Sequence, residues 1–238
     1  MKVVELHPWQ VTTEQAKQIQ KALASQVSTK NHIVAPRFIA GADISAPGSK
    51  GLARAAIVVL RYPGLEIAEV RTAEHELEFP YVPGLLSFRE SPLVLSACQQ
   101  LELTPDLLLV DGQGLAHPRR LGLACHLGLL LDIPTIGCAK SRLWGSHGPV
   151  GAEAGDRVEL VDEGEIIGAV LRTRPNVSPV YVSVGHKIDL DSASHWVMQC
   201  CRGYRLPDPI RLAHLAAAGQ FAPGLRLEAT TKIQAGLP

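Results

Sequence analysis

An aspartate, a histidine and two arginines follow one short apolar run in this sequence. The run 107–110 is aliphatic throughout and ends at Asp111, and His117, Arg119 and Arg120 come soon after it. Consecutive aliphatic residues predict a strand buried on both faces of an α/β sheet, and such sheets usually place their chemistry at the carboxyl ends of their strands. An acid beside these cationic groups suits metal and phosphate. A loop-capping aspartate with solvated arginines is an equally good interpretation of this segment alone.

Two further carboxylates could join Asp111. Asp43 lies inside an otherwise apolar predicted strand, and Glu90 lies at an expected helix start. A buried carboxylate is costly without a cation or a partner, so Asp43 needs an explanation. If its strand pairs beside the strand that ends at Asp111, the two aspartates meet and Glu90 can close the cluster, which suits Mg²⁺. The alternative is that Asp43 pairs with an arginine and that Glu90 stabilises the helix.

Basic residues leave the sheet near these acids. Lys140 and Arg142 follow the expected strand 135–138, as His117 and Arg119 follow the strand before it. They could form a positive rim suited to a phosphate backbone, although a solvated face is the usual role of such charges. His214, in the expected last helix, fits either a core histidine or a group that supports the site.

One tyrosine is held in a proline-rich loop. Pro80 and Pro83 flank Tyr81, and Gly84 follows. Each proline fixes its own φ and restricts the residue before it, so we expect Tyr81 on a stiff, extended tip. An aromatic ring there could replace a base in a stack and help to expel a nucleotide, whereas a packed loop with a buried tyrosine is the simpler alternative.

The elements that must position these residues begin with a helix and three strands. Thr12 and Gln15 fit a capping box, which predicts a helix over about 12–25. Apolar runs between turn residues predict strands, which we expect to be antiparallel, over 37–45, 53–61 and 66–73.

Helices alternate with strands in the rest of the chain. Ser91 and Pro92 predict a helix start, Asp191 is the expected cap of a helix ending near residue 201, and Pro207 introduces the last helix. A frayed tail is expected from Gly219. The remaining expected elements are strand 106–111, helix 119–131, strand 135–138, the hairpin 157–160 with 165–172, and strand 180–184. This order is that of an α/β, ribonuclease-H-like fold, with a mixed central sheet flanked by helices.

Length and composition fit one domain over residues 1–238. Lysine plus arginine and aspartate plus glutamate both number 23, which argues against nucleic-acid binding through bulk charge but allows a local basic patch. The five cysteines are odd in number and lack metal-type spacing, so buried thiols in a reducing cytoplasm are expected. We expect no secretory signal, no membrane segment and a monomer.

Several long motifs resemble those of the endonuclease V family, the deoxyinosine-specific DNA repair nucleases. They are PYVPG with LSFRE, LLLVDGQGLAHPR, IGCAKSRL, VSVGHKIDL and GYRLPDPIRLAH, and the resemblance as a whole runs from about residue 38 to residue 214. The resemblance implies a ribonuclease-H-like fold, in agreement with the order of the expected elements.

The resemblance also implies roles for individual residues. Asp43, Glu90 and Asp111 would bind the metal, with Lys140 beside the scissile phosphate and His214 nearby as a catalytic residue. Tyr81, between Pro80 and Pro83, would separate the strands, with His117 and Arg119 close to the DNA. The residues implied to line a pocket for the flipped base are Gly84, Leu86, Gly112 and Leu143.

The implied reaction is Mg²⁺-dependent, with Mn²⁺ as a substitute. The second phosphodiester bond 3′ to deoxyinosine would be hydrolysed, leaving 3′-hydroxyl and 5′-phosphate ends. Inosine in RNA stays open as a substrate. The alternatives are another ribonuclease-H-like nuclease, such as a junction resolvase, and a non-catalytic inosine-binding protein.

Overall fold

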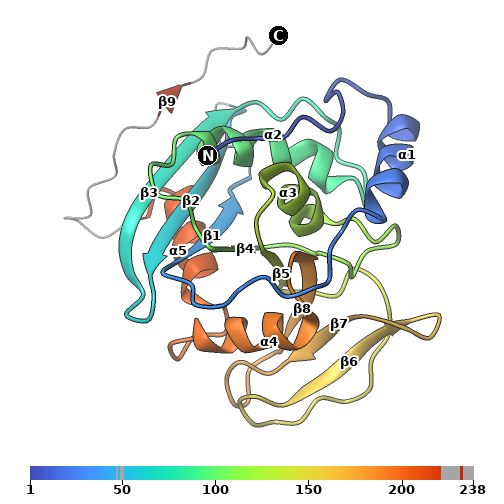
Figure 1. Ribbon diagram of the computed structural model, residues 1–238, viewed down its shortest axis with the longest axis vertical. Coiled ribbons are helices and arrows are strands. Elements are labelled where there is room, and N and C mark those ends of the chain that lie inside the picture. Colours follow the sequence, from blue (N-terminus) through green and yellow to red (C-terminus); the bar gives the residue numbers. More distant parts are fainter. Residues whose placement is uncertain (47, 49–50, 221–230, 233–238) are drawn as a thin grey trace.

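A mixed β-sheet covered by helices on both faces forms the centre of the molecule (Figure 1). The computed structural model describes residues 1–46, 48, 51–220 and 231–232. The strand order across the sheet is β6-β7-β8-β5-β4-β1-β2-β3-β9. The strands are β1 (Phe38–Ile44), β2 (Ala53–Arg61), β3 (Glu66–His75), β4 (Leu107–Val110), β5 (Thr135–Ala139), β6 (Arg157–Asp162), β7 (Glu165–Leu171), β8 (Val180–His186) and β9 (Thr231–Lys232).

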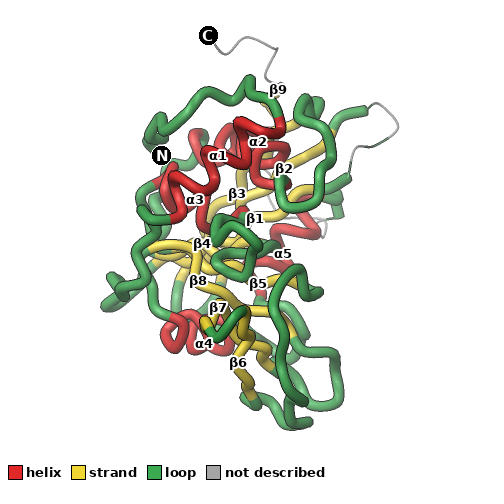
Figure 2. Tube along the Cα trace, turned by 90° about the vertical axis from the view of Figure 1, so that its right-hand side faces the viewer, coloured by secondary structure: helices red, strands yellow, loops and turns green. Residues whose placement is uncertain are grey.

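Two pairs of helices enclose the sheet. Alternating side chains of β1 divide between two apolar clusters: Ile39 packs with α4 and α5, while Ala40 packs with α2 and α3. Figure 2 shows α4 with β6 and β7 at one end of the molecule, and α1 and α2 toward the other. The helices are α1 (Thr13–Ala24), α2 (Leu86–Gln99), α3 (Leu123–Leu131), α4 (Leu190–Gln199) and α5 (Asp208–Ala217).

Strand β1 brings the two predicted aspartates to one edge of the sheet. It pairs antiparallel with β2 and parallel with β4, in a register that sets Ala42 beside Val110. The backbone N–H of Asp111 donates to the carbonyl of Ala42 at 3.1 Å. Asp43 and Asp111 are the next residues of these parallel strands, so both follow the same edge.

Helix α5 lies against β1 because residue 41 is a glycine. A Cβ atom on Gly41 would lie 2.0 Å from the carbonyl oxygen of Pro209, far inside van der Waals contact. The absence of a side chain therefore permits the close approach that brings α5, with His214, over the sheet.

Most of the predicted elements are confirmed, and the capping box at Thr12 and Gln15 is present. Helix α2, however, begins at Leu86 rather than at Ser91, so the predicted start was wrong. Pro92 lies inside this helix and removes one backbone hydrogen bond. The buried side chains of Leu85 and Phe88 anchor the earlier turn.

Two other helix starts were also placed wrongly. Helix α3 begins at Leu123, because the chain before it forms a turn in which Arg120 has a φ of 54°. Helix α4 is capped by Asp189 rather than Asp191: the Asp189 carboxylate accepts a hydrogen bond from the N–H of Ser192 at 2.7 Å.

The five cysteines are free thiols, as expected. In the described part of the chain, no helix combines the length and apolar character that a membrane crossing requires. The expected frayed tail from Gly219 lies mostly outside the described residues.

Candidate active site

Asp43 and Asp111 form the centre of the candidate site. Their side chains are 11% and 12% exposed. Burial raises the pKa of Asp43, and the negative charge of Asp111 raises it further. The two carboxylates are therefore close enough to repel one another, as their places at the ends of β1 and β4 predict.

A cationic or hydrogen-bonding side chain contacts each aspartate. Lys140, which follows β5, forms an ion pair with Asp111. His214, on α5, places Nδ1 2.6 Å from Oδ2 of Asp43. His214 thus belongs to the site and not to the core, which resolves the choice that the sequence left open.

Glu90, on α2, interacts electrostatically with Asp43 and Asp111. Burial raises the pKa of its carboxyl to about 7, and the charges of Asp43 and Asp111 contribute, against the lowering effect of Arg89. Glu90 on α2 therefore lies within electrostatic range of Asp43, at the end of β1, and of Asp111, which follows β4.

The donor set fits a divalent cation. Carboxylate oxygens are the ligands that hard divalent cations prefer. Burial, and then repulsion between the carboxylates, raises the pKa values of Asp43 and Glu90, and a bound cation would offset both effects. Among the described residues, no three side chains of the histidine, cysteine, aspartate or glutamate type stand as a ready-made metal site. The fit therefore rests on the chemistry and charge of the donors.

Tyr81 lies at the exposed tip of the loop before α2. Its side chain is 72% exposed, and Pro80 and Pro83 on either side are exposed as well. The expectation that Tyr81 projects from the loop is confirmed, and the alternative of a buried tyrosine is excluded.

Three donors hold the base of this loop. The carbonyl oxygen of Gly84 accepts hydrogen bonds from His117 Nε2 at 2.9 Å, from Arg119 Nη2 at 2.7 Å and from Gln20 Nε2 at 3.0 Å. Gly84 has a φ of 78°, and a Cβ atom there would lie 2.7 Å from Arg119 Nη2. We call Gln20, Gly84, His117 and Arg119 the loop clamp.

His117 is fully engaged within the loop clamp. Its Nδ1 accepts the N–H of Arg119 at 3.1 Å while Nε2 donates to Gly84. Burial lowers the pKa of His117 to about 4, so the ring is neutral at pH 7. A neutral ring is the form that can accept at one nitrogen and donate at the other.

Gln20 was missed by the sequence reasoning. It is fully buried on α1, accepts from Arg119 Nε at 2.6 Å and donates to the carbonyl of Leu121 at 3.1 Å. The available indication was its position: it lies on the same helical face as Ala16 and Leu23, where an apolar residue is expected.

The residues predicted to line a base pocket lie on the segments that carry Asp111, Glu90, Lys140 and Tyr81. Gly112 follows Asp111, partly buried Leu86 begins α2, and Leu143 is 45% exposed. The side chain of Gln113 donates to the carbonyl of Ser141 at 2.9 Å, which ties the glycine loop to the segment that carries Lys140 and Leu143.

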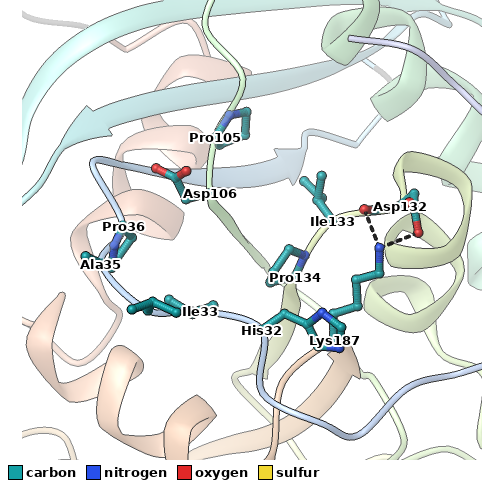
Figure 3. Close-up of a pocket in the computed structure, with 11 residues that line it drawn as sticks. His32, Ile33, Ala35, Pro36, Pro105, Asp106, Asp132, Ile133, Pro134 and Lys187 are labelled. Carbon is teal, nitrogen blue, oxygen red and sulfur yellow. Dashed lines mark hydrogen bonds and ion pairs between the residues drawn. The ribbon is translucent and has the colours of Figure 1, made fainter.

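A separate hollow lies at the opposite edge of the sheet (Figure 3). Pro36, Asp106 and Pro134, at the amino ends of β1, β4 and β5, line it. Its charged groups already have partners: Lys187 contacts Asp132 at 2.6 Å, and Asp106 accepts hydrogen bonds from the backbone N–H groups of Arg37 and Phe38. The chemistry of the site therefore belongs to the carboxyl edge and not to this hollow.

Comparison with known proteins gives a consistent result. The family model described as endonuclease V matches residues 21–215. A relative from Dehalococcoides mccartyi, named endonuclease V, is 52% identical over 218 residues, which cover 92% of this chain and 98% of the relative.

Solved structures agree with this match. Endonuclease V from Bacillus subtilis has a TM-score of 0.87 and 33% identity, covering 92% of this chain and 96% of its own. Endonuclease V from Ciona intestinalis, solved with a DNA containing an inosine followed by a ribo-adenosine, has a TM-score of 0.75 and 27% identity, covering 87% of this chain and 96% of its own.

Proposed function

Since this chain belongs to the endonuclease V family, and is therefore a nuclease that acts on DNA, we propose that its substrate is DNA carrying deoxyinosine. The proposed reaction is divalent-cation-dependent hydrolysis, with Mg²⁺ as the ion, of the second phosphodiester bond 3′ to the lesion, leaving 3′-hydroxyl and 5′-phosphate ends. The observation that carries the proposal is the electrostatic coupling of Asp43, Glu90 and Asp111 beside Lys140.

The carboxylates act as the proposed ligands. A divalent cation held by Asp43, Glu90 and Asp111 would supply activation of water and neutralise charge on the phosphate. His214 holds the Asp43 carboxylate in one orientation through its 2.6 Å contact. Lys140 provides a fixed positive charge, which exchanges its contact with Asp111 for one with the scissile phosphate when DNA binds.

The exposed loop acts on the duplex. Tyr81 inserts between bases and separates the strands, while the loop clamp keeps the loop in place. His117 and Arg119 serve the DNA through this clamp, since both already have protein partners. Extruding a base costs a few kcal/mol, and least for a weakly paired one, so inosine is favoured before any pocket contact forms. Gly84, Leu86, Gly112 and Leu143 are the proposed pocket lining.

The test is a nicking assay on a labelled duplex with one deoxyinosine. With Mg²⁺, we expect one nick, one nucleotide beyond the lesion on its 3′ side, and none in a matched duplex with adenine. Asp111→Asn should abolish the nick while retaining binding. Equal cleavage of both duplexes would overturn inosine recognition, and full activity of Asp111→Asn would remove Asp111 from the site.

A further inference from the structure

Trp144 follows Lys140 by four residues and lies against the end of β6, where it contacts Asp162. The segment 140–144 leaves β5 with Lys140 and Arg142 alternating with other residues, and it ends at Leu143 and Trp144. The side chain of Trp144 is 42% exposed and that of Leu143 45%. Two large apolar side chains that are exposed next to each other can form part of a contact surface.

The indole of Trp144 is held in one orientation. Its Nε1 donates to Oδ2 of Asp162 at 2.7 Å. The same carboxylate oxygen accepts from Arg120 Nη2 at 2.8 Å. The N–H group of the indole therefore has a hydrogen-bond partner within the protein, while the apolar surface of the ring is partly exposed to solvent.

The hydrogen bonds continue from Trp144 to the loop of Tyr81. Arg120 Nη1 donates to the carbonyl of His117 at 2.9 Å, and His117 donates to Gly84 of the loop clamp. Along the sequence, Lys140 precedes Trp144 by four residues, and Lys140 contacts Asp111. Trp144 is thus connected to the loop of Tyr81 through hydrogen bonds, and to Asp111 through the four preceding residues and the ion pair of Lys140.

From this arrangement we propose that Trp144 is a second aromatic contact to the substrate, stacking its indole face on a nucleobase next to the lesion pocket. The inference rests on the proposed function, because it assumes that DNA lies over Asp43 and Asp111. Sites for single-stranded nucleic acid combine basic groups along the backbone with aromatic rings beneath the bases. Arg142, exposed and without a hydrogen bond or ion pair to any described residue, adds a positive charge beside Trp144.

Fluorescence provides the direct test. The chain has three tryptophans, so a Trp9→Phe, Trp196→Phe variant leaves Trp144 as the single tryptophan, whose emission is followed. Adding Asp111→Asn prevents incision during a titration with inosine-containing duplex. We expect quenching of the Trp144 emission and reduced access of acrylamide to the ring, whereas unchanged emission and access would overturn the inference.

Binding measurements give the second readout. Trp144→Ala should weaken binding of inosine-containing DNA about 10-fold, and Trp144→Phe, which keeps a ring, should lose much less. Ile166→Ala is the matched control, because Ile166 is an exposed apolar residue (48%) on β7 without a ring. Equal binding by Trp144→Ala and wild type would overturn the inference, as expected if the indole instead serves a protein partner.

The two proposals fail in different ways. If the wild-type protein does not cut inosine-containing DNA, the proposed function is overturned, whatever the emission of Trp144 shows. If the wild type cuts as expected while Trp144→Ala binds normally, only the role of Trp144 is overturned.

Discussion

Nδ1 of His214 lies 2.6 Å from Oδ2 of Asp43, although 171 residues separate the two in the sequence. The His214 side chain is 55% exposed and that of Asp43 only 11%. The histidine therefore reaches the buried carboxylate from the open side of the site, and its contact partly offsets the repulsion that Asp43 experiences from Asp111.

Replacement of His214 should affect turnover more than substrate binding. We expect His214→Ala to lower kcat for incision by about 10–100-fold, the usual loss when a group that orients a ligand is removed. His214→Asn, which keeps a donor near the position of Nδ1, should recover part of that loss. A rise in KM with unchanged kcat in steady-state assays would contradict this role.

A methyl group at residue 41 should displace α5. Gly41→Ala places Cβ against the Pro209 carbonyl, so we expect a loss of about 1–3 kcal/mol in the free energy of unfolding, together with lower activity. Gly148→Ala is the matched control, because a Cβ there meets nothing within 4 Å. Denaturant unfolding compares the two variants. Equal free energies of unfolding would show that α5 can shift away from residue 41 without a loss of stability.

Glu90 makes the stability of the fold depend on pH. Its pKa is raised from 4.5 to about 7, so the folded protein keeps a proton that the unfolded chain has released. Its contribution to stability is fully present below pH 4.5 and is lost as pH rises through about 7. In metal-free buffer at pH 8, Glu90→Gln should therefore be more stable than wild type, by at most about 3 kcal/mol.

A measurement at low pH is the control for the effect of Glu90→Gln. Near pH 4, where both side chains are neutral, wild type and Glu90→Gln should unfold with similar free energies in the same denaturant titration. A stability difference that is the same at pH 4 and pH 8 would show that packing, and not ionisation, causes the effect.

Incision of duplex substrates should depend on Tyr81 more strongly than incision of single-stranded substrates. Tyr81→Ala removes the exposed ring that separates the strands, so incision of an inosine-containing duplex should fall by about 10-fold, while a single-stranded substrate loses much less. Tyr81→Phe keeps the ring and serves as the control. Equal losses on both substrates would count against a strand-separating role.

Gln20 should share the effect of Tyr81 through the loop clamp. Gln20→Leu removes its bonds to Gly84, Arg119 and Leu121, and we expect a loss of about 1–3 kcal/mol in stability and a preferential loss on duplex DNA. Gln18→Ala, on the exposed face of α1, is the control. Combining Gln20→Leu with Tyr81→Ala should add little further loss of duplex activity, whereas fully additive effects would separate the two residues.

The central strands and their carboxylates could be predicted because the pattern there is strong and local. Apolar runs end sharply at Asp111, and Asp43 is a carboxylate in an otherwise apolar strand. The start of α2 could not be predicted in this way, because Pro92 resembles a first helical residue and the anchoring of Leu85 and Phe88 depends on tertiary packing.

The contacts that position the side chains of the site could not be predicted from the sequence. The bond from Trp144 to Asp162 and the loop clamp both join segments that become neighbours only when the chain folds. Spacing along the chain indicates which face of an element a residue occupies, but it does not identify a distant partner. Gln20 shows this limit, since its periodicity predicts burial and not its hydrogen bonds.

The approach of α5 to β1 also sets the order in which a growing chain acquires its site. As the ribosome synthesises the protein, Asp43, Glu90, Asp111 and Lys140 all emerge before residue 208, where α5 begins. A chain released before that point carries the carboxylates without the histidine that holds Asp43, and it leaves Gly41 uncovered. The site therefore lacks the contact from His214 to Asp43 until α5 has been synthesised and has packed against β1.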